Sequence, residues 1–281
     1  MPGDLNHPPL KRVAVIGVTG RMGQALLHAA PGFPELIVTG ALASPASLAL
    51  GRDAGELAGL GVVNLVVTSD VKRALADADV ALDFSNAAAA GANLAACRAA
   101  RKPLLLGTTG LDAALEPALA AAAVEIPLMV APNTSIAVAL LVELVRQSAG
   151  KLPDTFDIDV IELHHRQKLD APSGTALTLA RAAAGARGLP LPSATTPPAD
   201  GSAPRGPRPA GQVGIASLRA GDLVGEHTVL FSGHGEQLAL SHRASDRAIF
   251  ARGALTAALW LMSQPPGRYA MREFIVAKTS S

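Results

Sequence analysis

The stretch RVAVIGVTGRMGQALLHAA, residues 12–30, decides the fold of this 281-residue chain. VAVIG is a short apolar run typical of a buried parallel strand, and MGQALLHAA continues as a helix. Between them lie Gly17, Gly20 and Gly23, spaced G-x-x-G-x-x-G instead of the usual G-x-G-x-x-G. Such a turn lets the backbone approach a pyrophosphate that the helix N-terminus then holds. The stretch Gly17-Val18-Thr19-Gly20-Arg21-Met22-Gly23 therefore predicts dinucleotide binding; a tight turn without a ligand is the alternative.

Further strands, most of them leading through a turn into a helix, follow up to about residue 150. We expect them at residues 35–44, 63–67, 80–84, 102–106 and 126–130. The turns after three of them read Asp83-Phe84-Ser85-Asn86, Gly107-Thr108-Thr109-Gly110 and Ala131-Pro132-Asn133-Thr134-Ser135. The carboxyl ends of parallel strands meet at one edge of the sheet, so these turns predict the place where a dinucleotide lies.

The end of the second strand bears on the choice of cofactor. A dinucleotide-binding unit usually carries an acid there for NAD, or a basic residue for the extra phosphate of NADP. Here the positions are Ala43 and Ser44. The acid is absent, and Ser44 together with Arg21 favours NADPH, with Arg52 as a further candidate.

The densest polar cluster is ELHHRQKLDAPSGTAL, residues 162–177, which follows the alternating strand FDIDVIEL. Ser173 is a good N-cap for a helix that we expect from residue 175 onward, and the free N–H groups of its first turn can hold a carboxylate or phosphate. His164, His165 and Lys168 would face the same space and suit proton transfer and anion binding. The cluster predicts a site for a small anionic substrate that needs a proton; surface histidines before an ordinary capped helix are the alternative.

The rest of the chain differs from the first half. Residues 189–212 are dense in Pro, Gly and Ser and predict a long mobile loop, in which Arg205 and Arg208 either fold over an anionic ligand or are solvated. Residues 213–245 alternate, with turns at 220–222 and 233–235, and predict three or four antiparallel strands. Because such a sheet needs a cover on its open face, we expect subunits to pair there. A long apolar helix at residues 246–264 should return to the first domain.

Composition excludes several classes of protein. The formal charge is +1, which does not indicate a nucleic-acid or membrane partner, and no run of eighteen residues predicts a membrane span. The N-terminus lacks an apolar signal core, so we expect a short disordered lead and a cytoplasmic protein. The single cysteine, Cys97, excludes an internal disulfide and is more simply a small buried residue than a nucleophile. HHRQK is not HExxH, so we expect no metal site.

The motifs VAVIGVTGRMG, DFS, GTTG, APNTS, ELHHRQKLDAPSGTAL, RAGDLVGEHT and SHRASDR are together similar to those of the dihydrodipicolinate (4-hydroxy-tetrahydrodipicolinate) reductase family. HHRxKxDAPSGTA is the specific part. The resemblance implies an α/β fold with a Rossmann-like dinucleotide-binding domain, residues 1–135 and 245–281. It also implies a second α+β domain with an open mixed sheet, residues 136–244, that binds substrate and builds a homotetramer.

The resemblance also implies an activity and residue roles. The family reduces the cyclic dehydration product of hydroxy-tetrahydrodipicolinate, a small dicarboxylate, with NADH or NADPH. His164 and Lys168 would transfer protons, and the substrate carboxylates would bind to His165, Ser173, Gly174 and Thr175. The cofactor contacts would be Gly17, Gly20, Arg21, Met22, Gly23, Gly107, Thr108, Thr109, Ala131, Pro132, Asn133 and Thr134.

The chain departs from the family pattern at two places, and two other functions compete. Ala43 and Ser44 replace the usual acid–arginine pair, and Thr134 stands where the family often has an apolar residue. The first rival function is another NAD(P)-dependent imine or amino-acid dehydrogenase of similar fold. The second is a dinucleotide sensor that has lost turnover.

Overall fold

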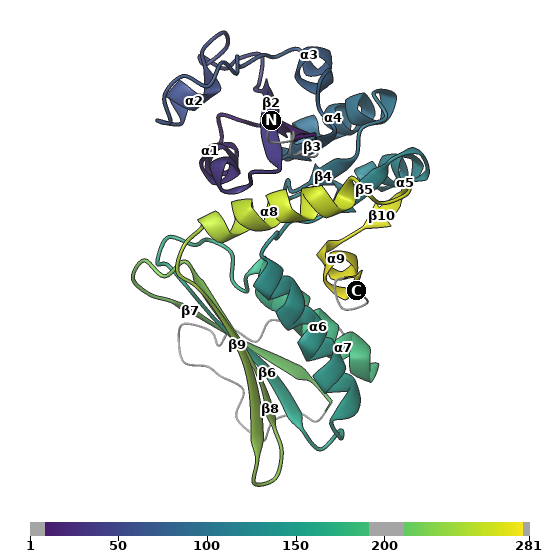
Figure 1. Cartoon of the computed structure of the whole chain (residues 1–281). Helices are drawn as coiled ribbons and strands as arrows, with labels where there is room; N and C mark the ends of the chain where they lie inside the picture. Colours follow the sequence, from purple (N-terminus) through teal and green to yellow (C-terminus); the bar gives the residue numbers. More distant parts are fainter. Residues whose placement is uncertain (1–8, 191–210, 278–281) are drawn as a thin grey trace, which may run out of the picture. The chain divides into compact units, whose positions relative to one another are not determined.

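The computed structural model describes residues 9–190 and 211–277 (Figure 1). The chain divides into two compact units, Met1–Ser135 with Ala248–Ser281, and Ile136–Arg247. Arg205, Arg208 and nearly all of the predicted loop at 189–212 lie outside the described residues, as does most of the predicted N-terminal lead. Among the described residues, no helix is both long enough and apolar enough to cross a membrane.

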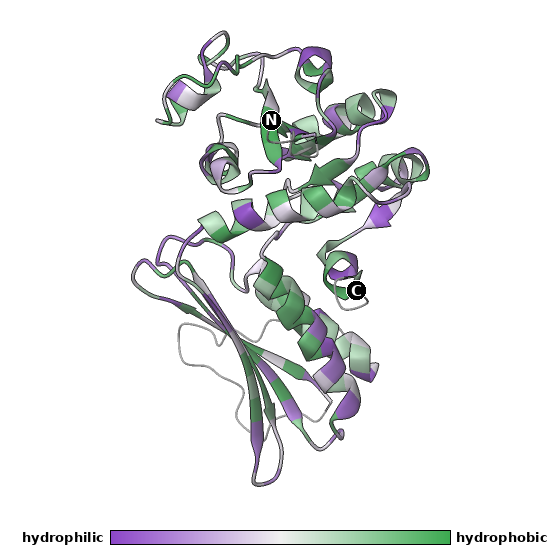
Figure 2. Cartoon of the chain, in the orientation of Figure 1, coloured by the Kyte–Doolittle hydropathy of each residue, from purple (hydrophilic) through white to green (hydrophobic). Residues whose placement is uncertain are grey.

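The first unit contains a parallel sheet with the strand order β10-β5-β4-β3-β1-β2 (Figure 1). The central strands β3 and β4 are buried because helices cover both faces of the sheet, and β4 appears as hydrophobic in Figure 2. The Rossmann-like prediction is confirmed. The strands are β1 (Lys11–Ile16), β2 (Leu36–Leu42), β3 (Val80–Asp83), β4 (Leu104–Leu106), β5 (Pro127–Val130) and β10 (Gly267–Tyr269).

Helices pack around this sheet. α1 packs against α8, α8 also packs against β3, β4 and β5, and α4 packs against α5. The predicted return of the C-terminal helix to the first unit is therefore confirmed, whereas β10 was not predicted. The helices are α1 (Arg21–Ala29), α2 (Ala54–Leu57), α3 (Val71–Leu75), α4 (Ala87–Ala99), α5 (Glu116–Glu125), α8 (Ala248–Leu261) and α9 (Met271–Ala277), with 3₁₀ turns η1 (Ala30–Gly32) and η2 (Ala113–Leu115).

The prediction of a strand at residues 63–67 is wrong. This segment makes only an isolated bridge, between Asp53 and Val66. The reason lies in the Asp53 carboxylate, which accepts hydrogen bonds from the N–H groups of Val63 at 3.2 Å and Leu65 at 2.9 Å. The same carboxylate caps α2. A side chain thus takes backbone donors that a neighbouring strand would otherwise bind.

The second unit is a mixed sheet with the order β7-β6-β8-β9, and α6 and α7 cover one of its faces (Figure 1). The implied mixed sheet is confirmed. The predicted antiparallel pairing is found for β8 and β9, whereas β7 runs parallel to β6, because α7 lies between these two strands in the chain, as in a βαβ crossover. The elements are α6 (Ile136–Lys151), β6 (Asp157–His164), α7 (Gly174–Arg187), β7 (Val213–Arg219), β8 (Gly225–Ser232) and β9 (Gln237–Ala244).

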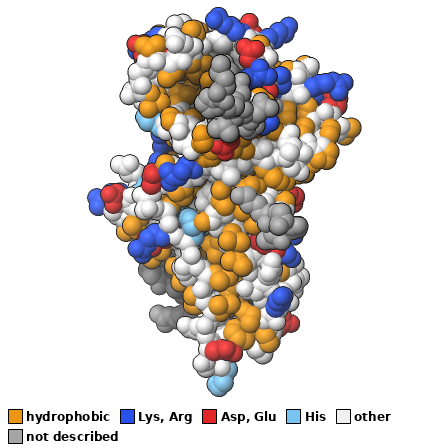
Figure 3. Space-filling view, in the orientation of Figure 1, with side chains coloured by type: hydrophobic (Ala, Val, Ile, Leu, Met, Phe, Trp, Pro, Cys, Tyr) orange, Lys and Arg blue, Asp and Glu red, His pale blue; other side chains and the backbone are white. Residues whose placement is uncertain are grey.

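The core of the second unit lies between the sheet and the two helices. Apolar side chains of β6 and β8 pack there against α6 and α7, among them Val160, Phe231 and Leu179. Exposed apolar side chains occur elsewhere on this unit as well, for example Leu140 and Leu144 on α6. Figure 3 shows such hydrophobic surface in the lower part of the view.

Candidate active site

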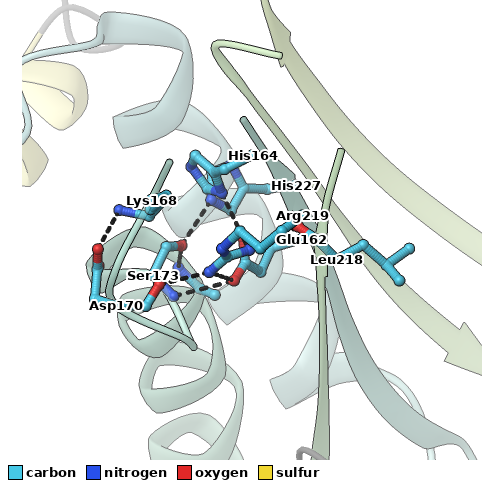
Figure 4. A network of polar contacts seen from close by, with 9 residues as sticks. Glu162, His164, Lys168, Asp170, Ser173, Leu218, Arg219 and His227 are labelled. Atoms are coloured by element: carbon cyan, nitrogen blue, oxygen red, sulfur yellow. Dashed lines mark hydrogen bonds and ion pairs between the residues drawn. The ribbon is translucent and has the colours of Figure 1, made fainter. Parts of the chain in front are cut away.

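Polar side chains replace apolar ones at the last part of β6, where the strand approaches the start of α7 (Figure 4). Glu162 and His164 are two residues apart on the strand, so both point to the covered face of the sheet. Glu162 is fully buried and His164 is nearly so. In the sheet register, Glu162 lies opposite His227 on β8, and His164 lies opposite Arg219 on β7. Three strands therefore supply one cluster.

The Glu162 carboxylate is the centre of this cluster. Arg219 donates two hydrogen bonds to it, at 2.8 and 3.0 Å, and the N–H of Ser173 donates a third at 3.2 Å. Its Oε2 also pairs with Nδ1 of His164. Burial opposes ionisation, but the hydrogen bonds from Arg219 and His164 outweigh it and hold the pKa of Glu162 below its usual value. The group is therefore a carboxylate at neutral pH.

His164 is a neutral imidazole at neutral pH. Burial lowers its pKa, and the charges of Lys168 and Arg219 add to this effect, while Glu162 acts in the opposite direction. Since Nδ1 faces a carboxylate, it carries the proton and Nε2 holds the lone pair. A Cβ added at Gly225 would lie 2.9 Å from Nε2. Glycine at position 225 therefore leaves room for the ring.

Ser173 joins the cluster to the helix. Its hydroxyl accepts from the N–H of Ala176 at 3.1 Å and caps α7, so the predicted N-cap is confirmed. The hydroxyl also lies 3.1 Å from Nε2 of His227, whose ring meets that of His164 edge to face with centroids 5.1 Å apart. Burial lowers the pKa of His227 to about 4.

Lys168 belongs to the loop between β6 and α7. Its ammonium donates to Asp170 at 2.7 Å, and its side chain is 21% exposed. Burial opposes ionisation of Asp170, but the hydrogen bond from Lys168 lowers the pKa of that carboxyl. Figure 4 places Lys168 on the same side of Ser173 as Asp170. His165 and Thr175 are partly buried and Gly174 is exposed, so these predicted residues are open to a ligand.

Several residues of this site escaped the sequence reasoning. Glu162 carried a signal, because a charged residue two positions before a histidine on an alternating strand shares its face. Asp170 lay inside the quoted motif but had no assigned role. Arg219, Gly225 and His227 lie inside the family motif RAGDLVGEHT, but no role followed from it, because only the register of β6 with β7 and β8 brings these residues to the cluster.

The cluster also contains a possible metal-ligand set that the spacing of the sequence did not reveal. Ligand atoms of Glu162, His164 and His227 lie within 4.8 Å of one another. Both oxygens of the Glu162 carboxylate, however, already accept from Arg219, whose charge disfavours a second cation. We therefore assign no metal to these three residues.

The glycine turn of the first unit fits a pyrophosphate. Gly17 has φ +83°, and a Cβ there would lie 2.7 Å from the carbonyl oxygen of Phe84. A Cβ at Gly23 would lie 2.4 Å from the carbonyl oxygen of Gly17. Gly20 caps α1 without a side-chain hydrogen bond, so the first N–H groups of the helix remain for a ligand. Around them Val18 is buried, Thr19 and Arg21 are exposed, and Met22 is partly buried.

The other predicted turns follow the same sheet edge. The N–H of Gly107 donates to the carbonyl of Asp83 at 2.9 Å, and the Thr108 hydroxyl approaches Asp83 at 3.3 Å. Thr109 and Pro132 are exposed, Asn133 is partly exposed and Ala131 is buried.

Two predicted cofactor contacts have environments of their own. Thr134 is buried and donates to the carbonyl of Phe250 at 2.7 Å, so its side chain turns inward. Ser44 is exposed just beyond β2, where its hydroxyl accepts from the N–H of Ala46 at 3.3 Å.

Comparison with known proteins gives a consistent result for both units. Residues 11–134 match the family model described as dihydrodipicolinate reductase, N-terminus, and residues 137–275 match dihydrodipicolinate reductase, C-terminus. The chain is 45% identical over 264 residues to the 4-hydroxy-tetrahydrodipicolinate reductase of Alkalilimnicola ehrlichii, covering 94% of this chain and 98% of that one. The enzyme of the same name from Thiobacillus denitrificans is 44% identical over 269 residues, with 95% and 99% covered.

Solved structures agree at the level of the fold. A dipicolinate-bound dihydrodipicolinate reductase from Paenisporosarcina sp. TG-14 superposes with a TM-score of 0.74 at 24% identity, over 93% of this chain and 97% of that chain. An amine dehydrogenase from Mycobacterium smegmatis gives a TM-score of 0.58 at 14% identity, over 95% and 96%.

Proposed function

Because the chain belongs to the dihydrodipicolinate reductase family, we propose a division of labour among its residues in the reaction of that family. The chain is an NAD(P)H-dependent oxidoreductase that reduces 4-hydroxy-tetrahydrodipicolinate, through its dehydrated ring, to tetrahydrodipicolinate in lysine and diaminopimelate biosynthesis. One observation carries the division of labour. The cluster of His164, Lys168 and Ser173 lies at the N-terminus of α7, where an anion and a proton are handled together (Figure 4).

The substrate carboxylates bind at the start of α7. The exposed Gly174 and the partly buried Thr175 form the first turn of a 14-residue helix, whose positive end favours a carboxylate. His165 and the Lys168 ammonium add positive charge and donors on the preceding loop. The Paenisporosarcina reductase holds dipicolinate, an aromatic dicarboxylate, which supports a dicarboxylate as the ligand of this chain.

Lys168 is the proton donor. The His164 ring is neutral, with Nδ1–H committed to Glu162, so it has no proton at Nε2 to give. The Lys168 ammonium carries a proton that it can release to the ring. His164 then accepts a proton from water at Nε2 and passes it to the neutral Lys168 amine, with the transient imidazolium stabilised by Glu162. When bound, the reduced nicotinamide supplies the hydride.

The residues of the first unit fit a pyridine dinucleotide, and those near β2 favour NADPH. The pyrophosphate is held by the backbone of Gly17, Gly20 and Gly23. At each of these positions an added Cβ would crowd a backbone carbonyl oxygen of the turn or of the neighbouring strand end. Beyond β2 stands the exposed Ser44 in place of an acid, and the exposed Arg21 begins α1. A cation without a neighbouring carboxylate suits a 2′-phosphate.

The face of the second sheet opposite α6 and α7 is the surface through which the chain forms a homotetramer. In the part of the chain that the structure describes, these two helices cover only one face of the sheet. The other face carries apolar side chains in register, Leu163 beside Leu218 and Ile161 beside Ala216, and Leu218 is 53% exposed. Light scattering should give the mass of four 28.4-kDa chains, and Leu218→Asp should reduce it. A monomeric wild type contradicts this assembly.

The reaction is tested by the absorbance of NADPH, and separately of NADH, during turnover of substrate generated by the preceding synthase. We expect consumption of both, with the higher kcat/KM for NADPH. If other cyclic imines or amino acids are turned over and this substrate is not, the chain is a different dehydrogenase. Binding of the nucleotide without consumption under any substrate identifies a sensor.

A further inference from the structure

The most deeply buried charge of the site is that of Glu162. Its exposed fraction is 0%, and its partners come from three elements: Arg219 on β7, Ser173 before α7, and His164 on its own strand. We propose that Glu162 is a positioning residue that fixes the tautomer and the orientation of the His164 ring, with Arg219 holding the carboxylate in place. The inference rests on the proposed proton-transfer role of His164.

The hydrogen-bond partners leave one solution for the tautomer. Oε1 of Glu162 accepts from Nη2 of Arg219 at 2.8 Å and from the N–H of Ser173 at 3.2 Å. Oε2 accepts from Nη1 of Arg219 at 3.0 Å and pairs with Nδ1 of His164. Guanidinium and backbone N–H groups can only donate, and a carboxylate can only accept. The proton of the neutral ring is therefore on Nδ1, and Nε2 is free to accept.

The charges around His164 explain why an anion is required there. Lys168 from the loop and Arg219 from β7 both disfavour the imidazolium form, as does burial. His227 from β8 is itself neutral, because burial lowers its pKa to about 4, and Asp170 is already paired with Lys168. Glu162 is the one group of this cluster that favours a proton arriving at Nε2. Such a carboxylate–histidine pair allows the ring to be protonated transiently without an unpaired buried charge.

A purely structural ion pair between β6 and β7 is the competing explanation. Buried ion pairs are poor stabilisers, because desolvation offsets most of their attraction. The two strands are already paired residue by residue from Ile158 to His164. The fork of Arg219 also extends past the strand to the carbonyl of Asp170 at 2.5 Å, which ties the Lys168 loop to the same carboxylate. These contacts indicate that Arg219 and Glu162 position the residues of the site, and that they are not needed to hold β7 against β6.

The variant Glu162→Gln separates the two explanations. The NH₂ of the glutamine would meet two fixed donors at the Oε1 position, Arg219 and the N–H of Ser173, but only one at the Oε2 position, Nη1 of Arg219. It therefore takes the Oε2 side, where His164 can respond by moving its proton to Nε2. We expect kcat/KM to fall by about 10²–10⁴-fold, the upper value being the loss when the carboxylate that orients a triad histidine is changed to its amide, while the Kd of NADPH stays the same. Because Glu162 raises the pKa of His164, its loss should move the acid limb of the kcat/KM profile to lower pH. Glu143→Gln is the matched control, a buried carboxylate paired with Arg146 on α6.

Nuclear magnetic resonance of ¹⁵N-histidine gives a second measurement, which reports the tautomer of His164 in the wild type as well as in the variant. The seven histidines of the chain allow His164 to be assigned by its absence in His164→Asn. We expect the neutral Nδ1–H tautomer in the wild type at pH 7.5 and the Nε2–H tautomer in Glu162→Gln. An Nε2–H or cationic ring in the wild type overturns the proposal, as does a Glu162→Gln enzyme with normal kcat/KM and an unmoved pH limb.

Failure of the proposed function gives a different result. If His164→Asn keeps its kcat/KM, His164 does not transfer protons, whatever its tautomer. If His164→Asn is impaired and Glu162→Gln is not, the role of His164 stands and the positioning role of Glu162 falls. If both are impaired, the double variant should be no worse than His164→Asn, because Glu162 acts only through that ring. A further loss in the double variant contradicts the inference.

Discussion

His227 should make the folded chain lose stability as the pH falls, by an amount that the structure sets. The imidazole is 5% exposed, and burial lowers its pKa to about 4, against 6.5 for an ordinary histidine. In the unfolded chain the ring takes up a proton below pH 6.5, whereas the folded chain resists it until about pH 4. The unfolded state thus binds more protons in this window, so the free energy of unfolding rises with pH there and falls as the solution is acidified.

The size of the effect follows from the two pKa values. One pKa unit corresponds to ~1.4 kcal/mol, so the folded state loses about 3 kcal/mol once the pH is below both values. At pH 5 the loss is about 2 kcal/mol, because the unfolded ring is already almost fully protonated and the folded ring is not. Above pH 7.5 the His227 ring is neutral in both states, so it adds nothing to the pH dependence of the free energy of unfolding.

The comparison is between the wild type and His227→Gln, whose amide can still reach the Ser173 hydroxyl but does not titrate. Urea unfolding followed by circular dichroism at pH 7.5 and pH 5.0 gives the free energy of unfolding for each. Groups distant from His227 titrate alike in both proteins and cancel, whereas the coupling of His227 with His164 and Glu162 is part of the measured difference. The wild type should lose about 2 kcal/mol more than the variant. Equal losses in the two proteins refute the reasoning that burial keeps His227 neutral.

Three other predictions follow from single contacts. Arg187 is nearly buried and donates to the carbonyl of Ala149 in the last turn of α6 and to that of Phe156 after the helix. Arg187→Ala should therefore lower the free energy of unfolding by about 3 kcal/mol, while the exposed Arg181→Ala on the same helix changes it little; equal effects refute the role. Gly23→Ala should abolish binding of NADPH, measured by nucleotide fluorescence, and Gly32→Ala, where an added Cβ meets no atom within 4 Å, should not. Burial raises the pKa of Cys97 to about 12, so a thiol reagent at pH 8 should label it only after unfolding; rapid labelling of the native protein contradicts this.

Features that depend on a few neighbouring residues could be predicted from the sequence. The glycine turn after β1 follows from a strand, its glycines and a helix, all within residues 12–30. The cap of α7 follows from Ser173 itself. The apolar helix α8 was predicted from its composition, although its ends lie at Ala248 and Leu261, inside the range expected. The period of apolar residues and the chemistry of caps are local, so one sequence is enough to read them.

Features that depend on register could not be predicted in the same way. Arg219 lies 57 residues after the carboxylate that it binds, and His227 lies 54 residues after Ser173. The direction of β7 in the sheet depends on the connection through α7 that joins it to β6. The alternation of residues within a strand does not reveal this direction. The missing strand at 63–67 failed for a different reason, because the Asp53 carboxylate binds backbone N–H groups that alternation assigns to a sheet.

One face of β6 combines features that are local in the sequence with features that depend on strand register. Ile158, Val160, Glu162 and His164 all point to the covered side, and the change from apolar to charged along this row marks the point where the core ends and the site begins. A charge in such a row costs free energy unless donors surround it. The chain supplies those donors from β7 and from the start of α7, which are the elements that also hold the Lys168 loop and the anion-binding helix end. A buried carboxylate stabilises a fold poorly. The presence of Glu162 at this point is therefore better explained by its control of the His164 tautomer than by the stability that it adds to the sheet.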